Sequence, residues 1–442
     1  MWDKRPEDWQ VVSLAEVTKP VRRKNDGGDH PVMTISAKNG FLLQSDKYSR
    51  DMAGQSLQRY ALLKEGEFAY NKGNSQTAPQ GCIFRLNRPT ALLPFVYYCF
   101  SLGPQIDPGF AAHAFGSGVI SRELARYINA GVRNDGLLNL YEKDFYRCSI
   151  ALPPYPEQLA IAEVLQSVED AIARKRELIG TLGETKKAVM RELLTKGKRR
   201  ENAPLKPLPE RWVLGRIAGG VKQIPKDWKL VRLTSVAKLE SGHTPNRDMP
   251  EYWGGTIPWL SLGDTDALDQ LTIQNTLEQV TEKGIKNSSA RVLPVDTVIF
   301  SRTATVGKAC RLAVEMATSQ DFANWVCGSD LDPRYLVQVF RHMKREWDRL
   351  QAGSTHQTIY MPTFKRLQIL LPPKAEQGKI ADTGEAFDRR IEAEKQSLAE
   401  LQNTRAALAQ ELLSGRLRLP ASMIARFENA PPSGKTSVAV TA

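Results

Sequence analysis

The sequence predicts a mixed α/β protein in which two globular α/β domains are joined by two long helices that form an antiparallel coiled coil. Three observations lead to this fold class. The segment "LPPYPEQLAIAEVL" from Leu152 returns as "LPPKAEQGKIADTG" from Leu371, which is 219 residues later. A coiled-coil pattern of apolar residues follows each copy, and the 442 residues are too many for one typical hydrophobic core. The chain is therefore predicted to contain two copies of one frame, related by a pseudo-twofold axis.

The repeat extends well beyond the Leu-Pro-Pro segments. The same shift places Trp9 of "RPEDWQVVSL" on Trp228 of "IPKDWKLVRL". Further identities at this shift are Pro6/Pro225, Leu14/Leu233, Tyr141/Tyr360, Phe145/Phe364, Arg147/Arg366, Glu157/Glu376, Gln158/Gln377, Ile161/Ile380 and Ala162/Ala381. Between these anchors the two copies diverge almost completely. Repeated segments around diverged segments indicate that the repeated segments have a structural role and that the diverged segments recognise two different ligands. Sequence drift without functional meaning would also leave this pattern.

Each Leu-Pro-Pro segment is followed by a predicted long helix. Apolar residues recur at steps of four and three over 161–193 and, shifted by 219, over 380–412, where eight and seven of ten positions are apolar. Such a seam is typical of a coiled coil. The prolines preset each helix start, and Gly197 and Gly415 stand where C-terminal caps belong. Neither helix can bury a seam of about 50 Å against one small domain, so the two are predicted to pack together; separate helices docked on partner proteins are the alternative.

The globular segments contain short apolar runs, such as "HPVMTIS" and "GTIPWLSL", between Gly, Pro, Asn and Asp residues, which predicts irregular sheets and loops. One stretch, "PRYLVQVFRHMKREWDRL" from Pro333, is predicted to be helical, with Tyr335, Leu336, Val339 and Trp347 facing inward. The predicted divisions are globular domains at 1–150 and 223–368, helices at 151–200 and 369–419, a linker at 201–222 and a disordered tail at 420–442.

Composition narrows the kind of partner. The chain has 61 Lys and Arg against 49 Asp and Glu, which gives a net charge of +12. This charge favours an acidic partner, such as nucleic acid or an anionic membrane surface. The alternative is an ordinary basic soluble protein without such a partner. Five scattered cysteines without C-x-x-C or zinc-finger spacing predict buried thiols in a reducing cytosol and no metal site. The start "MWDKRPEDWQ" has no apolar signal core, and "ALLPFVYYCF" is far short of the roughly 20 residues that span a bilayer, so a soluble cytoplasmic protein is expected.

Two types of polar loop recur in both copies, one after a strand and one before the Leu-Pro-Pro frame. The strand-end loops are "FAYNKGNS", with Asn71, Lys72 and Asn74, and "VIFSRTATVGK", with Arg302, Thr303 and Lys308. The loops before the frame are "GVRNDGLLN", with Arg133 and Asn134, and "GSTHQTIYM", with Thr355, His356 and Gln357. Lys38, Asn39, His243 and Thr244 complete the candidate DNA-binding residues. Arg and Lys suit guanine, and Asn and Gln suit adenine; a single loop of this kind is usually a solvated turn, but its recurrence favours binding.

The sequence offers no catalytic apparatus of its own. Amino-methyltransferases carry Asn or Asp before Pro-Pro-Tyr or Pro-Pro-Phe, but here Leu152 and Leu371 occupy that position, and an aliphatic side chain cannot accept a hydrogen bond from an amino group. The segment "NAPPSGKTSV" imitates a phosphate-binding loop, yet Asn429 replaces its first glycine. Motifs of metal and serine hydrolases are absent from the sequence. Methyltransferase activity of the chain itself therefore stays a minor alternative.

Several of these segments together resemble the specificity (S) subunit of type I restriction-modification systems. They are "IPKDWKLVRLTSVAKLESGHTP", "YWGGTIPWLSLGD" and "GSTHQTIYMPTFKRLQILLPPKAEQGKIA", with the first-half echoes "RPEDWQVVSL" and "LPPYPEQLAIAEVL". The resemblance extends to about residue 419 and is stronger in the second half, because the first half lacks the Ser-Gly-x-Thr-Pro opening.

The resemblance implies a non-catalytic reader of double-stranded DNA. Each globular domain would be a target recognition domain for one half of a bipartite site, and the coiled coil would set the distance between the halves. Two methyltransferase (M) subunits would bring S-adenosylmethionine and methylate adenine N6, and restriction/translocase (R) subunits would bring ATP and Mg; no cofactor is expected in this chain and no membrane partner. A coiled-coil scaffold with protein-binding globular ends is the alternative.

Overall fold

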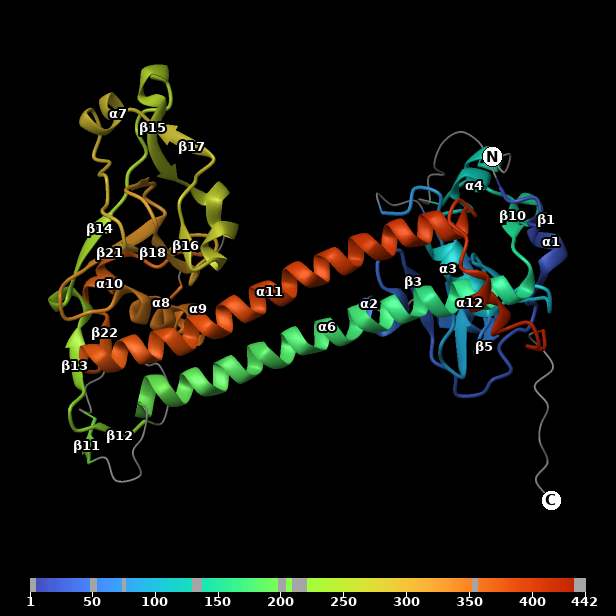
Figure 1. Cartoon of the computed structure of the whole chain (residues 1–442), viewed down its shortest axis with the longest axis horizontal. Coiled ribbons are helices and arrows are strands. Elements are labelled where there is room, and N and C mark those ends of the chain that lie inside the picture. The colour runs from blue at the N-terminus through green and yellow to red at the C-terminus, as the bar shows by residue number, and fades with distance from the viewer. Residues whose placement is uncertain are drawn as a thin grey trace. The chain divides into compact units, whose positions relative to one another are not determined.

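Two compact units make up the chain in the computed structural model. The structure describes residues 5–47, 54–73, 77–128, 137–197, 204–208, 221–351 and 357–432. Unit 1 comprises Met1–Lys175 and Ser397–Ala442, and unit 2 comprises Arg176–Gln396. The two long helices, α6 (Tyr155–Lys196, green in Figure 1) and α11 (Lys374–Leu413, orange-red), therefore each contribute residues to both units. The predicted linear divisions do not show this sharing.

The coiled-coil seam is confirmed within each unit. Every seam position of both helices is buried or half-buried. In unit 1, Glu169 of α6 forms an ion pair with Arg405 of α11 (2.5 Å), and in unit 2, Lys186 of α6 forms one with Asp388 of α11 (2.5 Å). In unit 1, Glu157, which precedes Glu169 in α6, pairs with Arg418 (2.7 Å), which follows Arg405 and lies just after the end of α11. Earlier residues of α6 therefore meet later residues of the second segment. The two helices are thus antiparallel.

Unit 1 is built on a four-stranded antiparallel sheet in the order β2 (Thr18–Pro20), β9 (Tyr98–Leu102), β6 (Phe68–Asn71), β7 (Cys82–Arg85). Two antiparallel two-stranded sheets accompany it, β3 (Met33–Ser36) with β4 (Gly40–Leu43) and β5 (Ala61–Lys64) with β8 (Thr90–Leu93). Its short helices are α1 (Leu14–Val17), α2 (Gln44–Lys47), η1 (Gly54–Arg59), α3 (Pro108–Gly116), α4 (Ser121–Tyr127) and α5 (Glu142–Arg147).

Unit 2 repeats this sheet order with β14 (Ala237–Ser241), β21 (Phe322–Cys327), β18 (Val298–Ser301) and β19 (Ala309–Leu312), all antiparallel, and adds β16 (Thr272–Ile273). A second sheet contains β17 (Glu278–Val280), β15 (Trp253–Leu260) and β20 (Ala317–Thr318). The remaining short helices are η2 (Leu233–Ser235), η3 (Pro250–Tyr252), η4 (Leu262–Asp269), α7 (Glu282–Lys286), α8 (Pro333–His342), α9 (Lys344–Leu350) and α10 (Met361–Lys365). The shared sheet lies in the segments whose sequences have diverged.

The repeated frame has the same strand register in both units. Strand β1 (Gln10–Ser13) pairs antiparallel with β10 (Ser149–Leu152), and β13 (Lys229–Arg232) pairs antiparallel with β22 (Gln368–Leu371). Val11 lies opposite Ala151, and Leu230 lies opposite Leu370, so each partner is displaced by the same 219 residues. The internal repeat is therefore a repeat of backbone pairing.

A buried tryptophan joins each frame to the start of its long helix. Trp9 and Trp228 are at most 1% exposed, and their indole N–H groups donate to Glu157 (3.2 Å) and Glu376 (2.9 Å) respectively. These carboxylates are the hydrogen-bond partners that a buried indole requires. The repeated Pro-x-x-Trp and Glu residues are thus explained by one contact made twice.

The next residue of each helix makes a second repeated contact. The amide oxygen of Gln158 accepts the backbone N–H of Asp107 (2.8 Å), and that of Gln377 accepts the backbone N–H of Asp332 (2.8 Å). Both aspartates are N-caps, of α3 and α8 respectively. Each long helix is therefore hydrogen-bonded to the start of a short helix that packs on the sheet.

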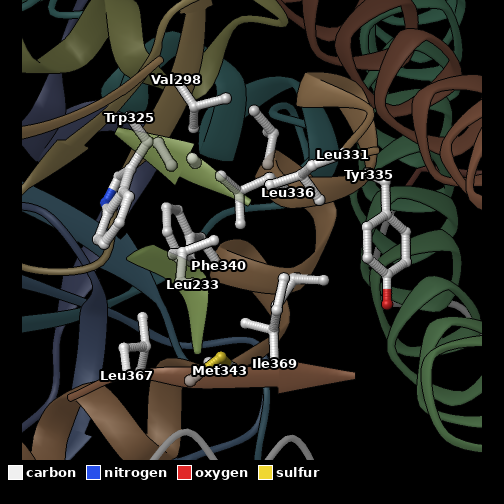
Figure 2. Close-up of a cluster of buried hydrophobic side chains, with 14 of the residues drawn as sticks. Leu233, Val298, Trp325, Leu331, Tyr335, Leu336, Phe340, Met343, Leu367 and Ile369 are labelled. Carbon is white, nitrogen blue, oxygen red and sulfur yellow. The ribbon is translucent and has the colours of Figure 1, made fainter. Parts of the chain in front are cut away.

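The core of unit 2 confirms the predicted inward face of the helical stretch from Pro333. Figure 2 shows Leu336 and Phe340 beside Trp325, and Tyr335, Leu336, Val339 and Trp347 are all at most 1% exposed. The stretch is two helices, α8 and α9, rather than one. The indole of Trp347 donates to the carbonyl of Phe340 (2.8 Å), which satisfies a backbone acceptor beside the break.

Two predicted divisions need correction. The linker contributes a strand, β11 (Leu205–Pro207), which pairs with β12 (Gln223–Pro225). The tail predicted to be disordered from 420 contains a helix, α12 (Ala421–Ala425), which begins after Pro420, and Arg426 pairs with Glu163 (2.8 Å). Proline presets a helix start, and the ion pair joins this segment to α6. Of the described part, no helix is long and apolar enough to cross a membrane.

All five cysteines are free, and the prediction that they are buried thiols holds for three of them. Cys99, Cys148 and Cys310 are buried, and Cys82 and Cys327 are half-buried. Burial raises the pKa of the Cys99 thiol to about 12, which disfavours the reactive thiolate. Within the described residues, no group of three or more His, Cys, Asp or Glu side chains is placed to hold a metal ion.

Candidate nucleic-acid interface

In unit 2 the two predicted loop types lie side by side. Strand β18 ends at Ser301, and the loop that follows forms a β-bridge between Thr303 and Thr358. The N–H of Ile359 donates to the carbonyl of Arg302 (2.9 Å). The strand-end loop is thus held by backbone hydrogen bonds to the segment that precedes the Leu-Pro-Pro frame.

Arg302 is the central side chain of this group. Its Nε donates to the carbonyl of Gln320 (2.9 Å), and its Nη1 approaches the carbonyl of Ile359 (3.3 Å). The side chain is half-buried, and this burial lowers the pKa of Arg302 although the nearby Asp321 opposes the change. Two contacts use only part of the five N–H donors of a guanidinium group, so Arg302 is oriented and still able to donate to a ligand.

A third segment joins the same group. Thr244 donates through Oγ1 to the amide oxygen of Gln320 (2.7 Å). His243 is exposed, and its backbone N–H donates to Thr318 (2.9 Å) while its carbonyl accepts the indole N–H of Trp259 (3.1 Å). Gln320 was not among the residues selected from the sequence. The only feature of the sequence that could have indicated it is its place in a polar segment, "TSQD", between two strands.

The tip of the strand-end loop has an unusual backbone. Ala304 is exposed and has a positive φ of 60°, and its N–H donates to the carbonyl of Gln357 (3.1 Å). A left-handed conformation costs a residue with a side chain about 1 kcal/mol or more, and such strain is concentrated at functional sites. The exposed residue Gln357 is therefore hydrogen-bonded to the loop tip through its backbone. Thr355 and His356 lie outside the described residues.

Lys308 is placed less favourably for a ligand. Its ammonium group contacts Asp269 (2.9 Å), Asp266 (3.2 Å) and the carbonyl of Thr265 (3.2 Å). Burial opposes the charge of Lys308, but the two carboxylates outweigh it and raise the pKa of the side chain. A DNA contact by Lys308 would have to compete with these oxygen atoms.

Unit 1 holds the equivalent loops in the same way. Strand β6 ends at Asn71, the N–H of Leu138 donates to the carbonyl of Lys72 (2.8 Å), and Gly73 forms a β-bridge with Leu137. Because β6 and β18 occupy the same place in the sheet order, Lys72 of unit 1 corresponds to Arg302 of unit 2. Asn74, Arg133 and Asn134 lie outside the described residues.

The predicted side chains of unit 1 divide into structural and exposed groups. The amide of Asn71 donates to the carbonyl of Ile35 (3.0 Å) and accepts the N–H of Gly73 (2.9 Å), so it holds the loop together. The ammonium group of Lys72 lies over the Tyr98 ring, 5.2 Å from its centroid. Lys38 and Asn39 are exposed in the turn between β3 and β4.

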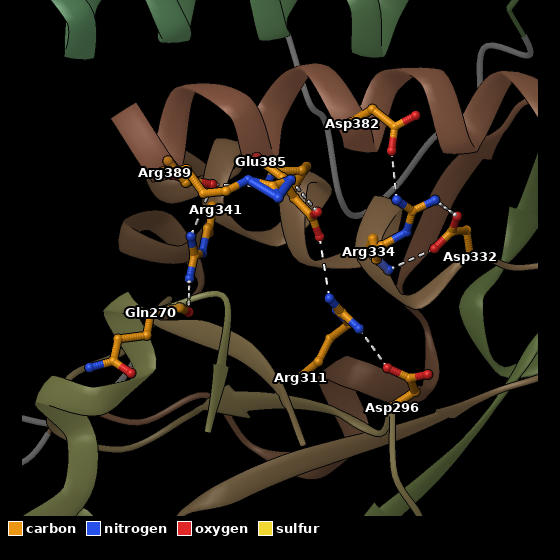
Figure 3. Close-up of polar contacts among 11 residues, drawn as sticks. Gln270, Asp296, Arg311, Asp332, Arg334, Arg341, Asp382, Glu385 and Arg389 are labelled. Atoms are coloured by element: carbon orange, nitrogen blue, oxygen red, sulfur yellow. Dashed lines mark hydrogen bonds and ion pairs between the residues drawn. The ribbon is translucent and has the colours of Figure 1, made fainter. Parts of the chain in front are cut away.

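The sheet domain of unit 2 is attached to α11 by ion pairs (Figure 3). Arg334 of α8 contacts Asp382 of α11 (2.6 Å), and Arg311 of β19 bridges Asp296 (2.5 Å) and Glu385 of α11 (3.3 Å). Glu385 is buried, so its charge is compensated by a partner within the protein. The loops of this unit therefore project from a sheet that is fixed to the helix.

Unit 1 also contains a cavity of about 640 Å³ between the end of α3, the start of α4 and the last turns of α11. Its lining includes the guanidinium-bearing residues Arg5, Arg122, Arg405 and Arg416 and the small residues Gly116, Gly118, Ala406 and Ala409. The position of Ala409 corresponds, at the 219-residue shift, to Met190 in unit 2, which is 2% exposed within the hydrophobic core.

The structure thus defines a class of protein with a repeated helix-and-sheet frame that presents one pair of loops in each of two units. A family model for the type I restriction modification DNA specificity domain matches residues 225–403. Residues 225–403 therefore carry a type I restriction modification DNA specificity domain, and the resemblance inferred from the sequence is confirmed.

Individual relatives agree with this assignment. The chain is 30% identical over 177 residues to the type I restriction enzyme MjaIX specificity subunit of Methanocaldococcus jannaschii, a match that covers 40% of this chain and 41% of that protein. It is 22% identical over 428 residues to the putative MjaX specificity subunit of the same organism, which covers 94% and 95% respectively. The crystal structure of the type I restriction-modification S subunit from M. genitalium has a similar fold, with a TM-score of 0.53, 12% identity and coverage of 93% and 96%.

Proposed function

We propose that each unit of this specificity subunit reads one half of a bipartite site in double-stranded DNA and that the helix pair sets the spacing of the halves. One observation carries this proposal. The same pair of loops projects from the same strand of the same sheet in both units, but the side chains differ, as Lys72 and Arg302 do. A common platform with different polar groups suits two different base sequences.

The target recognition domains are proposed at 1–150 and 223–368, between the helices at 151–200 and 369–419. The side chains best placed to meet base edges are Arg302, Thr244 and Gln357 in unit 2, since Arg302 is oriented and Gln357 is exposed. In unit 1 the proposed set is Lys72, with Lys38 and Asn39. His243, Thr303, Lys308 and Asn71 are proposed to support these loops or to meet the backbone, and Asn74, Arg133, Asn134, Thr355 and His356 complete the proposed interface.

The chain is proposed to act without catalysis of its own, in the cytoplasm, where the DNA is. Two M subunits would supply S-adenosylmethionine and methylate adenine N6, and R subunits would supply ATP-dependent, Mg-dependent restriction. The net charge of +12 supports an anionic ligand, since a basic surface attracts the DNA backbone.

The test uses the full chain purified with its methyltransferase partner. The target motif is first found by mapping methylated adenines in the host genome. Binding to a DNA duplex that carries this methylated motif is then compared with binding to a scrambled duplex of equal length and composition, over a range of salt concentrations. We expect a preference of at least about 1000-fold, as is typical of specific binders. No preference for any bipartite sequence would contradict the proposal, and weak, salt-insensitive binding would favour a protein-binding scaffold.

A further inference from the structure

The residues repeated between the two copies fall into two groups by exposure. Most are core residues: Trp9 and Trp228 are at most 1% exposed, and Phe145 and Phe364 are both 0% exposed. Tyr141 and Tyr360 are also repeated, but they are 58% and 59% exposed. Packing accounts for the first group and does not account for an aromatic residue that stays on the surface in both units.

The two tyrosines occupy the same place beside the candidate interface. Tyr141 directly follows the segment whose Leu138 is hydrogen-bonded to Lys72, and Tyr360 directly follows Ile359, which is hydrogen-bonded to Arg302. Each tyrosine is also the N-cap residue of a short helix, α5 or α10. Among the described residues, neither hydroxyl group forms a hydrogen bond. Both hydroxyls are therefore available at the edge of the paired loops.

The same short helices lead to a second repeated and exposed residue. Arg147 is the last residue of α5, and Arg366 is the C-cap of α10. The side chain of Arg147 is 65% exposed and reaches Asp144 (3.2 Å), whereas Arg366 is exposed and has no ion pair with the part of the chain that the structure describes. Each unit thus carries one exposed Tyr and one exposed Arg at matching positions.

The chemistry of DNA suggests why these four residues are the same while the loops differ. The two halves of a bipartite site differ in their bases but share one sugar-phosphate backbone. Contacts with bases specify the sequence, and contacts with phosphates only position the protein; Arg and Tyr side chains are both common phosphate donors. Residues that meet bases should therefore differ between the units, and residues that meet the backbone should be repeated.

We infer that Tyr141 and Arg147 in unit 1, and Tyr360 and Arg366 in unit 2, contact the phosphate backbone of the two half-sites irrespective of their sequence. This inference rests on the proposed function. The competing occupant of these surfaces is a protein partner present in two copies, which would also meet both units alike.

The test compares two double variants of the full chain in complex with its methyltransferase partner: Tyr141→Phe with Tyr360→Phe, and Arg147→Gln with Arg366→Gln. The first removes two hydroxyl groups and is expected to weaken binding about tenfold. The second removes two phosphate contacts and is expected to reduce the slope of log K against log salt by about 2. Both losses should be equal for the methylated motif and for scrambled DNA, so that the specificity ratio is unchanged.

Matched controls are Tyr252→Phe and Arg174→Gln, since neither residue is repeated: Met33 and Ala393 occupy the corresponding positions. Unchanged DNA affinity of a double variant would remove that pair from the contact, and a changed specificity ratio would overturn the assignment to the backbone. Weaker assembly with the methyltransferase at unchanged DNA affinity would assign the surface to the protein partner. If the unmodified complex itself shows no sequence preference, the proposed function fails first, independently of the variants.

Discussion

Units 1 and 2 make the same ion pair between their helices but support it differently. Glu169 with Arg405 in unit 1 corresponds, at the 219-residue shift, to Asp388 with Lys186 in unit 2. In unit 1 the carboxylate also faces the buried His113, at 3.5 Å.

In unit 2 the equivalent carboxylate has neutral and cationic partners from α8. Asp388 accepts a hydrogen bond from Gln338 (3.0 Å) and forms an ion pair with Arg341 (3.1 Å). Burial lowers the pKa of Lys186, although Asp388 opposes the change. The position of the charge pair is thus shared, while the groups around it have diverged. The frame is therefore maintained as a set of contacts, and the residues around it differ between the units.

The largest expected effect tests whether the two frames are energetically alike. Trp9→Ala and Trp228→Ala each remove a buried indole and leave a carboxylate, the buried Glu157 or the half-buried Glu376, without that donor. Each substitution should destabilise its own unit by about 3 to 5 kcal/mol, measured by urea unfolding. Similar losses of unfolding free energy in the two variants would show that the tryptophan contact stabilises both units to the same extent. A loss in only one unit would show that the repeated contact matters in one copy alone.

The next effect concerns DNA reading by the corresponding loop residues. Arg302→Ala should weaken binding by about 1 to 3 kcal/mol if the side chain meets a base edge, and only mismatches in one half of the site should become tolerated. Lys72→Ala should act on the other half. Binding is measured with duplexes substituted in each half separately. If both variants lost sequence specificity for the same half-site, Lys72 and Arg302 would not have corresponding roles in the two units.

The charge pair of unit 1 predicts a dependence of stability on pH. The hydrogen bond from His113, together with Arg405, lowers the pKa of Glu169 to about 2 against the opposing effect of burial. The carboxylate therefore contributes its full stability above about pH 4.5, and the contribution is lost as the pH falls from there through about 2. Since the Glu169 side chain is 37% exposed, solvent screening limits the effect to about 1 kcal/mol.

The measurement is urea unfolding at pH 7 and at pH 3 for the unmodified chain and for Glu169→Gln. The variant should lose less stability on acidification than the unmodified chain by about that amount. Glu184→Gln serves as the control, because it removes an exposed carboxylate from the same helix. An equal loss in all three proteins would mean that the Glu169 carboxylate carries no such stability.

The smallest expected effect comes from the cavity of unit 1. Ala409→Met introduces the residue that fills the corresponding position of unit 2, and cavity filling of this kind stabilises a protein by about 0.5 to 1 kcal/mol. The reciprocal Met190→Ala should destabilise unit 2 by about 2 kcal/mol or more. A destabilising Ala409→Met would show that the cavity cannot accept the longer side chain.

The sequence was sufficient for the features that repeat at one shift. The two helices and their seam were predicted, because both depend on residues at fixed spacing. The Pro-x-x-Trp and Leu-Pro-Pro segments were identified as a repeated frame, but the tryptophan contact and the strand pairing within it were not predicted. The common sheet was not predicted. Its strands β6 and β18 end at Asn71 and Ser301, which are 230 residues apart, because the preceding loops differ in length.

The loops of the candidate site were predicted, but the roles of their side chains were not. A polar residue after a strand can face a ligand or hold its own loop, and only the packing distinguishes the two. Asn71 holds its loop, Lys308 is paired with carboxylates, and Arg302 is oriented but retains free donors. Gln320 was missed because its role depends on contacts with Arg302 and Thr244, which are distant from it in sequence.

The central claim is that two units read two half-sites at a distance set by α6 and α11. It is tested most directly by inserting one heptad into each helix, after Lys175 and after Gln396, which preserves the seam, and mapping methylated adenines in cells that carry the variant. Seven residues lengthen a helix by about 10 Å, so both half-sites should persist with a spacing about 3 base pairs longer. Retained methylation at the original spacing, or altered half-sites, would contradict the account.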